Sequence, residues 1–377
     1  MDAVISGEHL GRLFEALQTE GFQIVGPRLG EGAIVLRRLS SPKDLPAGLS
    51  DVQQPGRYRI ACGNPDLMFS FGPGPDTWRR FLFPTPQEEF ACTRTADGWD
   101  LTPTPPDKRP LALFGVRACD IHAIRMLDRI FLGGEAVDPH YRARRTSCAV
   151  IAVNCTHPGG NCFCASLGTG PTAEEGFDLC LTELAAVGAS GFLVQTGSDL
   201  GDTILDQIPL RSASETERAA PQQIAKALSA RMRRLGYPAG LQTLIPARHQ
   251  SPVWQEAAKR CTACGSCTLV CPTCFCTDTV DTCDLAGDWA KRVRIWGSCF
   301  SRRHSYIHGG PVRASVASRY RQWVTHKFAA WVDQFGRLGC VGCGRCITWC
   351  PVGIDVLSVI EQIRNETPGK ISTGKGE

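Results

Sequence analysis

The chain has 377 residues, 43% hydrophobic and 21% charged, which suits a globular protein of two domains. Its net charge of +4 is too small to indicate a nucleic-acid partner on its own. The opening residues lack a signal-peptide pattern and no apolar run reaches the roughly 18 residues of a membrane span, so we expect a cytoplasmic protein. In that reducing compartment, twenty cysteines indicate metal binding and not disulfides.

The first 110 residues give weak structural signals. Residues 6–18 carry apolar side chains at helical spacing, with Ser6 as a possible cap. Residues 22–25 and 34–36 are typical of short strands. The Pro-rich and Gly-rich segment 40–110 predicts loops and a few antiparallel strands, and nothing in the chain matches a nucleotide-binding glycine motif in its required context.

A clearer pattern of alternating strands and helices begins at residue 111. Residues 111–116 and 148–153 form buried-type apolar runs, and Asp120 is positioned to cap a helix between them. Further strands are predicted at residues 177–184 and 191–196. This order predicts an α/β N-terminal domain with a mixed, partly parallel sheet, in which functional groups gather beyond the carboxyl ends of the strands.

Residues 197–250 predict a polar, helical connection to a second domain. We place the domains at residues 1–245 and 246–377. The second has a long insertion, residues 272–339, which we expect to be helical, with one helix over Tyr320–Phe335. A last helix is predicted after Val356, followed by a disordered polar end.

Two cysteine runs with one spacing, C-x-x-C-x-x-C-x-x-x-C-P, lie at residues 261–272 and 340–351. This repeated pattern is typical of a ferredoxin-like domain with two [4Fe–4S] clusters, in which the fourth cysteine of each run binds the other cluster. Zinc also accepts four thiolates, but a zinc ribbon uses two C-x-x-C pairs without this spacing. The predicted ligands are Cys261, Cys264, Cys267 and Cys350 for cluster 1, and Cys340, Cys343, Cys346 and Cys271 for cluster 2.

A third group of cysteines follows two predicted strands of the N-terminal domain. It comprises Cys119, Cys155, Cys162 and Cys164. Four thiolates from two loops are enough for a third [4Fe–4S] cluster, with zinc or simple packing of buried cysteines as alternatives. Cys148 could replace one of the ligands.

The other cysteines allow two interpretations. Cys62, Cys92 and Cys180 stand alone, and we interpret them as core or free thiols. Four more lie in the insertion: Cys274, Cys276, Cys283 and Cys299. They either pack beside a cluster, which we favour, or form a further ligand set or a ligand exchange.

The insertion is also basic: residues 291–327 hold nine Lys or Arg and three His, but no Asp or Glu. A nucleic-acid patch is disfavoured because no recognition motif accompanies the charge. The basic segment can instead be a solvated face that balances negative clusters, or a docking surface for an acidic redox partner.

Several longer stretches resemble a known family. These stretches are FGVRACDIHAI (114–124), LDRIFL (127–132), NCTHPGGNCFCASLGTGP (154–171), GFDLCLTEL (176–184), CPTCFC (271–276) and HKF (326–328). In them the chain resembles the iron–sulfur β subunit of cytosolic sulfhydrogenases, the NAD(P)-linked [NiFe] hydrogenases, and the related A subunit of anaerobic sulfite reductase, a 4Fe–4S dicluster protein. The resemblance covers most of residues 110–360 and little of the first 110.

The resemblance implies an electron-transfer subunit of an oxidoreductase complex. Such a subunit passes electrons between a flavin-containing, NAD(P)H-oxidising diaphorase subunit and the [NiFe] hydrogenase small and large subunits. In the alternative, the electrons go to a sirohaem sulfite reductase subunit. No catalytic residue is expected, because electron transfer needs no general acid or base. Two other classes stay open: an enzyme that acts on sulfur compounds at a cluster with three cysteines, and a structural zinc protein.

Overall fold

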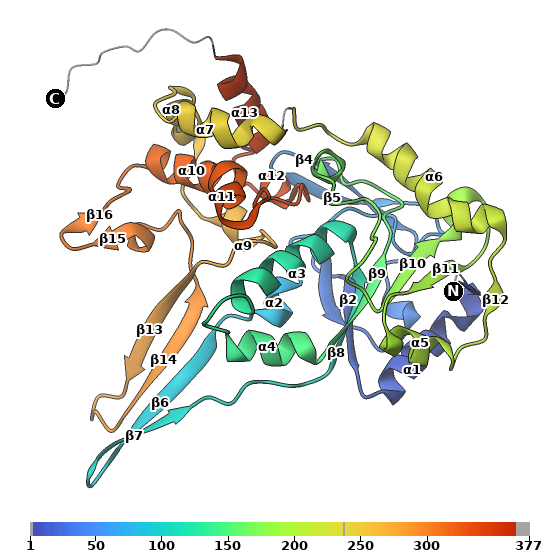
Figure 1. The fold of residues 1–377 in the computed structure, drawn as a ribbon, viewed down its shortest axis with the longest axis horizontal. Coiled ribbons are helices and arrows are strands. Elements are labelled where there is room, and N and C mark those ends of the chain that lie inside the picture. The colour runs from blue at the N-terminus through green and yellow to red at the C-terminus, as the bar shows by residue number, and fades with distance from the viewer. Residues whose placement is uncertain (1–2, 237, 367–377) are drawn as a thin grey trace.

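The computed structural model describes residues 3–236 and 238–366, and its centre is a mixed eight-stranded sheet (Figure 1). The strand order is β12-β1-β11-β10-β9-β8-β2-β3. Strands β10, β9, β8 and β2 run parallel to one another, and the remaining pairs are antiparallel. In this order the strands span Arg211–Ser212, Ala3–Ile5, Phe192–Thr196, Leu179–Glu183, Cys148–Val153, Leu111–Val116, Gln23–Leu29 and Ile34–Arg38. The prediction of a mixed, partly parallel sheet is confirmed.

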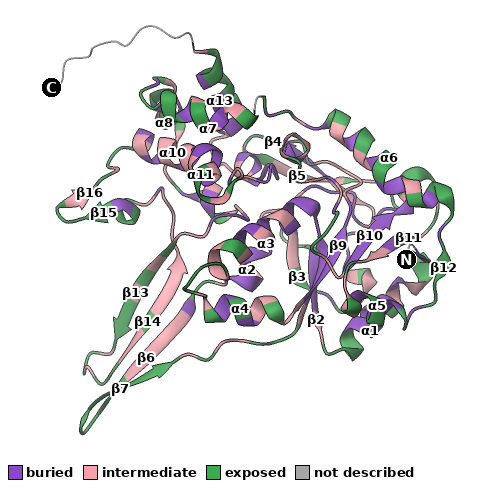
Figure 2. Ribbon diagram, viewed as in Figure 1, coloured by how far each residue is buried: buried purple, intermediate pink, exposed green. Residues whose placement is uncertain are grey.

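Helices cover both faces of this sheet, and the central strands are buried (Figure 2). One face packs against α1 (Leu10–Thr19) and α5 (Asp199–Leu205), with Phe14 and Ile204 in the shared core. The other face packs against α3 (Ala118–Phe131), together with further helices. These are α2 (Arg79–Leu82), α4 (Pro139–Thr146) and α6 (Glu215–Arg231). The alternation in β9 explains the arrangement, because Ile151 faces the first core and Val150 the second.

The cysteine runs lie on a separate core made by the C-terminal helices. Its buried residues come from these helices and include Trp254, Trp323 and Ile360. The helices are α7 (Leu241–Ala247), α8 (Val253–Arg260), α9 (Ser266–Leu269), α10 (Val316–Thr325), the π-helix His326–Ala330, α11 (Trp331–Phe335), α12 (Arg345–Thr348) and α13 (Val356–Asn365). The helices predicted near 320–335 and after Val356 are confirmed; the polar end after residue 366 lies outside the described residues. The predicted domain boundary after residue 245 falls within α7 and stays a prediction.

The prediction of a helical insertion is wrong for its first half. Residues 277–296 form the hairpin of β13 (Thr277–Cys283) and β14 (Trp289–Trp296). The sequence TDTVDTC is rich in β-branched residues, which favours a strand over a helix. A further short pair, β15 (Tyr306–Ile307) and β16 (Gly310–Pro311), precedes α10.

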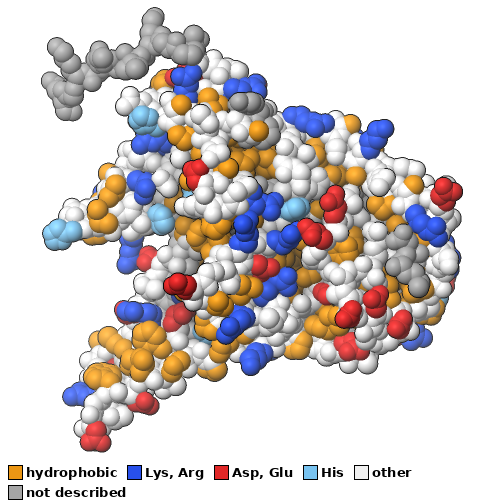
Figure 3. Space-filling model, viewed as in Figure 1, with side chains coloured by type: hydrophobic (Ala, Val, Ile, Leu, Met, Phe, Trp, Pro, Cys, Tyr) orange, Lys and Arg blue, Asp and Glu red, His pale blue; other side chains and the backbone are white. Residues whose placement is uncertain are grey.

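This hairpin is completed by a distant part of the chain. β14 pairs with β6 (Gln87–Thr95), which pairs with β7 (Gly98–Pro103), so that β13-β14-β6-β7 form one sheet that projects from the body (Figure 1). We call it the arm. Figure 3 shows hydrophobic side chains and scattered charges on its surface, and Trp99 and Leu101 are more than half exposed. The antiparallel strands expected within residues 40–110 are therefore confirmed.

A second hairpin from the same region packs on the second cysteine run. It consists of β4 (Leu49–Gln54) and β5 (Arg57–Cys62). Tyr58 stacks on Trp349 at 5.0 Å, and the backbone N–H of Gly56 donates to the carbonyl oxygen of Ile347. Gln53 accepts a hydrogen bond from the Thr348 hydroxyl at 3.0 Å. The N-terminal part of the chain thus packs against the second cysteine run.

Candidate metal centres

The two cysteine runs fold into nearly identical loops. Ala263 and Gly342 both have a positive φ, and their N–H groups lie 3.4 Å from the sulfur atoms of Cys261 and Cys340. In each run a glycine with positive φ then starts a short helix, α9 or α12. This left-handed turn lets a short loop present three cysteines to the same side, which is the geometry expected for cluster-binding loops.

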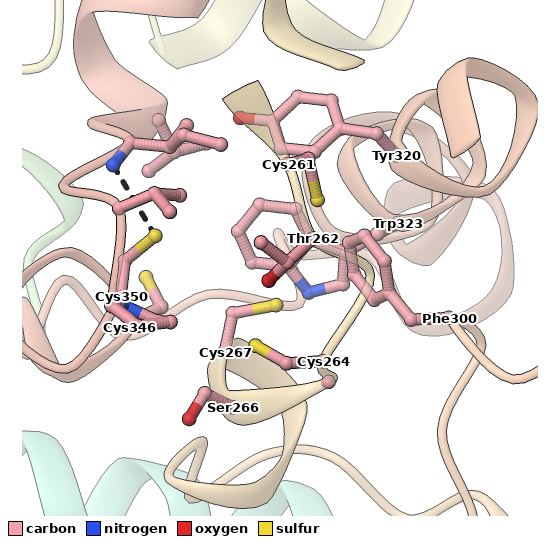
Figure 4. A pocket seen from close by; sticks show the side chains of 15 residues that line it. Cys261, Thr262, Cys264, Ser266, Cys267, Phe300, Tyr320, Trp323, Cys346 and Cys350 are labelled. Carbon is pink, nitrogen blue, oxygen red and sulfur yellow. Dashed lines mark hydrogen bonds between the residues drawn. The ribbon is translucent and has the colours of Figure 1, made fainter. Parts of the chain in front are cut away.

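The first loop lines a cavity that contains all four cysteines predicted for cluster 1. Cys261, Cys264, Cys267 and Cys350 line this cavity, together with Cys346 from the second run (Figure 4). Aromatic residues close the other side: Phe300, Tyr320 and Trp323. The backbone N–H of Ile354 lies 3.2 Å from the Cys350 sulfur. Thiols around a largely apolar space suit a soft, thiolate-bound group that water should not reach.

A second cavity contains the four cysteines predicted for cluster 2. Cys271, Cys340, Cys343 and Cys346 line it, again with apolar residues around them. Cys346 borders both cavities, so the two sites are direct neighbours. Burial raises the pKa values of Cys340, to about 12, and of Cys343. These thiols would therefore stay protonated at neutral pH unless a metal bound them, because a metal replaces the proton.

The third group of cysteines is also brought together. Cys119 lies in the first turn of α3, Cys155 follows β9, and Cys162 and Cys164 lie in the next loop. Their thiols are close enough to interact electrostatically, and burial raises the pKa of each one. As predicted, the group lies beyond the carboxyl ends of parallel strands.

Cys148 does not belong to this group. It begins β9, whereas Cys155 follows its end, and its sulfur lies 3.9 Å from an Arg145 nitrogen. A strand of this length separates the two cysteines by roughly 20 Å. The possibility that Cys148 replaces one of the ligands is therefore wrong.

The third group packs directly on the second cysteine run. The Cys162 sulfur lies 3.6 Å from the carbonyl oxygen of Cys343, and the N–H of Phe163 donates to Gly342 at 2.8 Å. A Cβ atom at Gly342 would lie 2.6 Å from the Cys164 backbone, so only glycine allows this approach. Thr169 adds a hydrogen bond to the Val341 carbonyl oxygen at 2.8 Å. Three groups of thiols thus form a continuous series.

A buried ion pair holds these loops together. Arg345, between two predicted ligands of cluster 2, donates to both carboxylate oxygens of Asp120 at 2.8 and 3.1 Å. The two side chains are only 4% and 3% exposed. Asp120 was predicted to cap α3, but the N-cap is Arg117, and Asp120 lies within the helix. That prediction is wrong because the carboxylate accepts hydrogen bonds from Arg345 in the second cysteine run instead of from its own helix.

A buried lysine lies beside the second cavity. Lys327, in the π-helix, donates to the Thr273 hydroxyl at 2.6 Å, and that oxygen is 3.2 Å from the Cys271 sulfur. Burial lowers the pKa of Lys327, but nearby thiolates, Cys271 first among them, raise it more, so the ammonium stays charged. π-helices are often found at functional sites. The HKF motif marked this segment, but nothing in the sequence distinguished this lysine from the other basic residues of the insertion.

Two further predictions concern the cysteines that stand alone and the basic segment of the insertion. Cys180 is fully buried in the core, whereas Cys62 is exposed and Cys92 lies on the arm, so all three lie apart from the cavities. Several basic side chains of the insertion pair with acids, among them Arg292 with Asp281. The interpretation of this segment as a docking surface stays a prediction.

These sites suit an iron–sulfur cluster better than a single metal ion. Within residues 3–236 and 238–366, no group of three or more His, Cys, Asp or Glu is arranged to hold a single metal ion. Tetrahedral zinc draws four sulfurs to about 2.3 Å from one point. Four thiols spaced around a cavity, with backbone N–H groups near their sulfurs, match the donor set of an iron–sulfur cubane.

Fold and donor set together define an iron–sulfur electron-transfer protein, and comparison with known proteins agrees. The family model of the 4Fe-4S dicluster domain matches residues 260–354. The chain is 35% identical over 266 residues to the sulfhydrogenase 2 subunit beta of Pyrococcus furiosus, which covers 67% of this chain and 73% of that protein. The chain therefore belongs to the family of sulfhydrogenase β subunits. No solved structure matches the chain, and none of the helices in its described part is long and apolar enough to cross a membrane.

Proposed function

We propose that this chain relays electrons in a cytoplasmic, sulfhydrogenase-type complex. It would accept electrons from a flavoprotein subunit that oxidises NAD(P)H and pass them to the small and large subunits of a [NiFe] hydrogenase, or carry them in the opposite direction. The observation that supports this most is the continuous series of three thiol groups, in which Cys346 borders two cavities and Cys162 contacts the loop of Cys343. The similarity to a sulfhydrogenase β subunit supports this kind of complex.

The proposed ligands are the twelve cysteines in three sets of four. Cluster 1 takes Cys261, Cys264, Cys267 and Cys350; cluster 2 takes Cys340, Cys343, Cys346 and Cys271; cluster 3 takes Cys119, Cys155, Cys162 and Cys164. The first two sets would make the C-terminal part a ferredoxin-like dicluster domain. [4Fe–4S] groups bound there would supply one-electron carriers whose potentials depend on burial and on hydrogen bonds to sulfur.

The residues around the cavities would shield the clusters from water and stabilise their negative charge. Phe300, Tyr320 and Trp323 shield one side of the first cavity from water. Backbone N–H groups such as that of Gly342 point to ligand sulfurs and stabilise their negative charge. Lys327 adds a buried positive charge beside the second cavity, which favours the reduced, more negative form of a group bound there.

The experiment that tests this proposal is anaerobic purification of the tagged chain with its native partners. Nickel and flavin in the same complex, with iron and acid-labile sulfide on this chain, are expected. Sirohaem in place of nickel would favour the sulfite reductase alternative. A chain that contains zinc without iron would refute the relay.

One substitution separates the relay from the partners' own chemistry. Cys264→Ser should abolish NAD(P)-linked hydrogen turnover, yet spare hydrogen oxidation by an artificial dye that takes electrons at the [NiFe] subunits. Cys283→Ser is the matched control, because this exposed thiol lies at the far end of β13. It should leave both activities unchanged. Equal loss of both activities in Cys264→Ser would contradict the proposal.

A further inference from the structure

Three cysteines outside the proposed relay gather at the base of the arm. Cys276 immediately precedes β13, and Cys299 follows β14. The two strands pair up to Thr277 and Trp296, and the N–H of Gly297 donates to the Cys276 carbonyl oxygen at 2.8 Å. The hairpin therefore closes its own base and brings these two thiols together, although 23 positions separate them in the sequence.

The third member is Cys274, which precedes Cys276 in the same loop. It is 7% exposed, its carbonyl oxygen accepts a hydrogen bond from Arg79, and its thiol interacts electrostatically with that of Cys271 at the edge of the second cavity. Cys299 interacts electrostatically with Cys276, and also with Cys271. The motif Cys-Phe-Cys at 274–276 repeats the arrangement of Cys162 and Cys164 in the third group, where two further cysteines complete the set.

Two buried cations face this group without an acidic partner. Arg79 is 2% exposed and Lys327 is 4% exposed. Within the described residues neither has a carboxylate within ion-pair distance. Arg79 donates to the carbonyl oxygens of Cys274 and Leu269, lies 3.7 Å over the ring of Trp296, and leaves its buried Nε without a partner. A buried charge is costly unless an opposite charge compensates it.

The position of Arg79 distinguishes this group from the second cavity. Lys327 lines that cavity, so a cluster there can supply its countercharge. Arg79 does not line it, and the thiols that interact electrostatically with its guanidinium are those of Cys274, Cys271 and Cys276, with Cys274 first. An anionic group on the Cys274 and Cys276 side of the loop would compensate the charge of Arg79.

The geometry points to a further iron–sulfur site: a fourth [4Fe–4S] cluster bound by the thiolates of Cys274, Cys276 and Cys299, with Arg79 as its countercharge. The site has three cysteine ligands, because its other neighbours, Cys271 and Cys267, belong to the relay. It lies beside both cavities, as Cys299 also interacts with Cys267. It would be a branch from the series of three clusters and not a part of it.

The test compares two triple variants after anaerobic purification. In Cys274→Ser/Cys276→Ser/Cys299→Ser, iron and acid-labile sulfide should fall by about four atoms each, from about sixteen to about twelve per chain. The control is Cys62→Ser/Cys92→Ser/Cys283→Ser, which removes the same number of thiols at positions away from the cavities. It should keep the wild-type content.

An unchanged iron content in the first triple variant would overturn the fourth cluster and leave the relay intact. Zinc at this site in place of iron would also overturn it. Loss of Cys274 could disturb the fold, so Cys276→Ser and Cys299→Ser are measured singly as well; these half-buried thiols tolerate a hydroxyl better. Each single variant should lose iron or change the EPR signals of the reduced protein, and wild-type signals with wild-type iron in both would refute the site.

Discussion

The ion pair between Asp120 and Arg345 should be one of the most important contacts for stability in this protein. Replacing Asp120 by Asn keeps the size of the side chain but leaves the Arg345 guanidinium buried without a countercharge. The pair is bidentate at 2.8 and 3.1 Å, and both side chains are under 5% exposed. Breaking such a pair from one side costs about 3–5 kcal/mol. Because Arg345 retains its bond to the Gly74 carbonyl oxygen, we expect Asp120→Asn to lower the free energy of unfolding by about 3 kcal/mol, the lower end of this range.

A solvent-exposed ion pair elsewhere in the chain provides a matched control. Arg292 and Asp281 form a bidentate pair at 2.7 Å, but the side chains are 44% and 61% exposed. Asp281→Asn should therefore lower the free energy of unfolding much less than Asp120→Asn, because solvent screens an exposed pair. Urea unfolding under anaerobic conditions, followed by tryptophan fluorescence, measures both changes in the free energy of unfolding.

A double variant identifies the cause of the loss. Asp120→Leu/Arg345→Met removes both charges and should recover most of the stability lost in Asp120→Asn, since apolar replacements of buried pairs are often neutral. If Asp120→Asn unfolds at the same urea concentration as Asp281→Asn, the buried pair contributes no more than a surface pair. In that case our reasoning on how the two halves are joined would be wrong.

Three more predictions follow from other residues. Lys327→Met should lower the midpoint potential of a cluster by roughly 100 mV in an EPR-monitored redox titration, because one nearby buried charge contributes a Coulomb energy of this size. The control Lys259→Met, at an exposed position, should not change the potential. Cys119→Ser should lose about four irons per chain and Cys148→Ser none; equal iron in both would refute the third cluster. Burial raises the pKa of Glu183 to about 7 from its usual 4.5, so the folded state binds this proton more tightly than the unfolded state. The resulting stability, about 3 kcal/mol, should be present below pH 4.5 and be lost as the pH rises to 7, and Glu183→Gln should remove this pH dependence from urea midpoints.

Local patterns predicted much of the fold. The apolar runs at residues 111–116 and 148–153 coincide with β8 and β9, because continuous apolar runs flanked by polar residues suit strands buried on both faces. The same reasoning placed Cys119 and Cys155 at one edge of the sheet. The spacing of the two cysteine runs predicted which thiols would line each cavity.

Long-range contacts could not be predicted in this way. Asp120 looked like a helix cap because its local sequence context allows one, and its partner Arg345 lies 225 positions away. Arg79 and Lys327 looked like ordinary basic residues, since burial cannot be seen in one sequence. The grouping of Cys276 with Cys299 depended on a hairpin that was expected to be helical. In each case the information lay in tertiary structure and not in periodicity.

The arm also limits how this protein can be divided or recombined. Residues 87–103 and 277–296 supply two strands each to one sheet, so neither part completes it alone. A chimera that transplanted only residues 260–354 would leave β14 with an open edge, which is prone to aggregation. During synthesis, β6 must wait for β14 to emerge more than 180 residues later. Any modular reuse of these cysteine loops would therefore need to include the early hairpin as well.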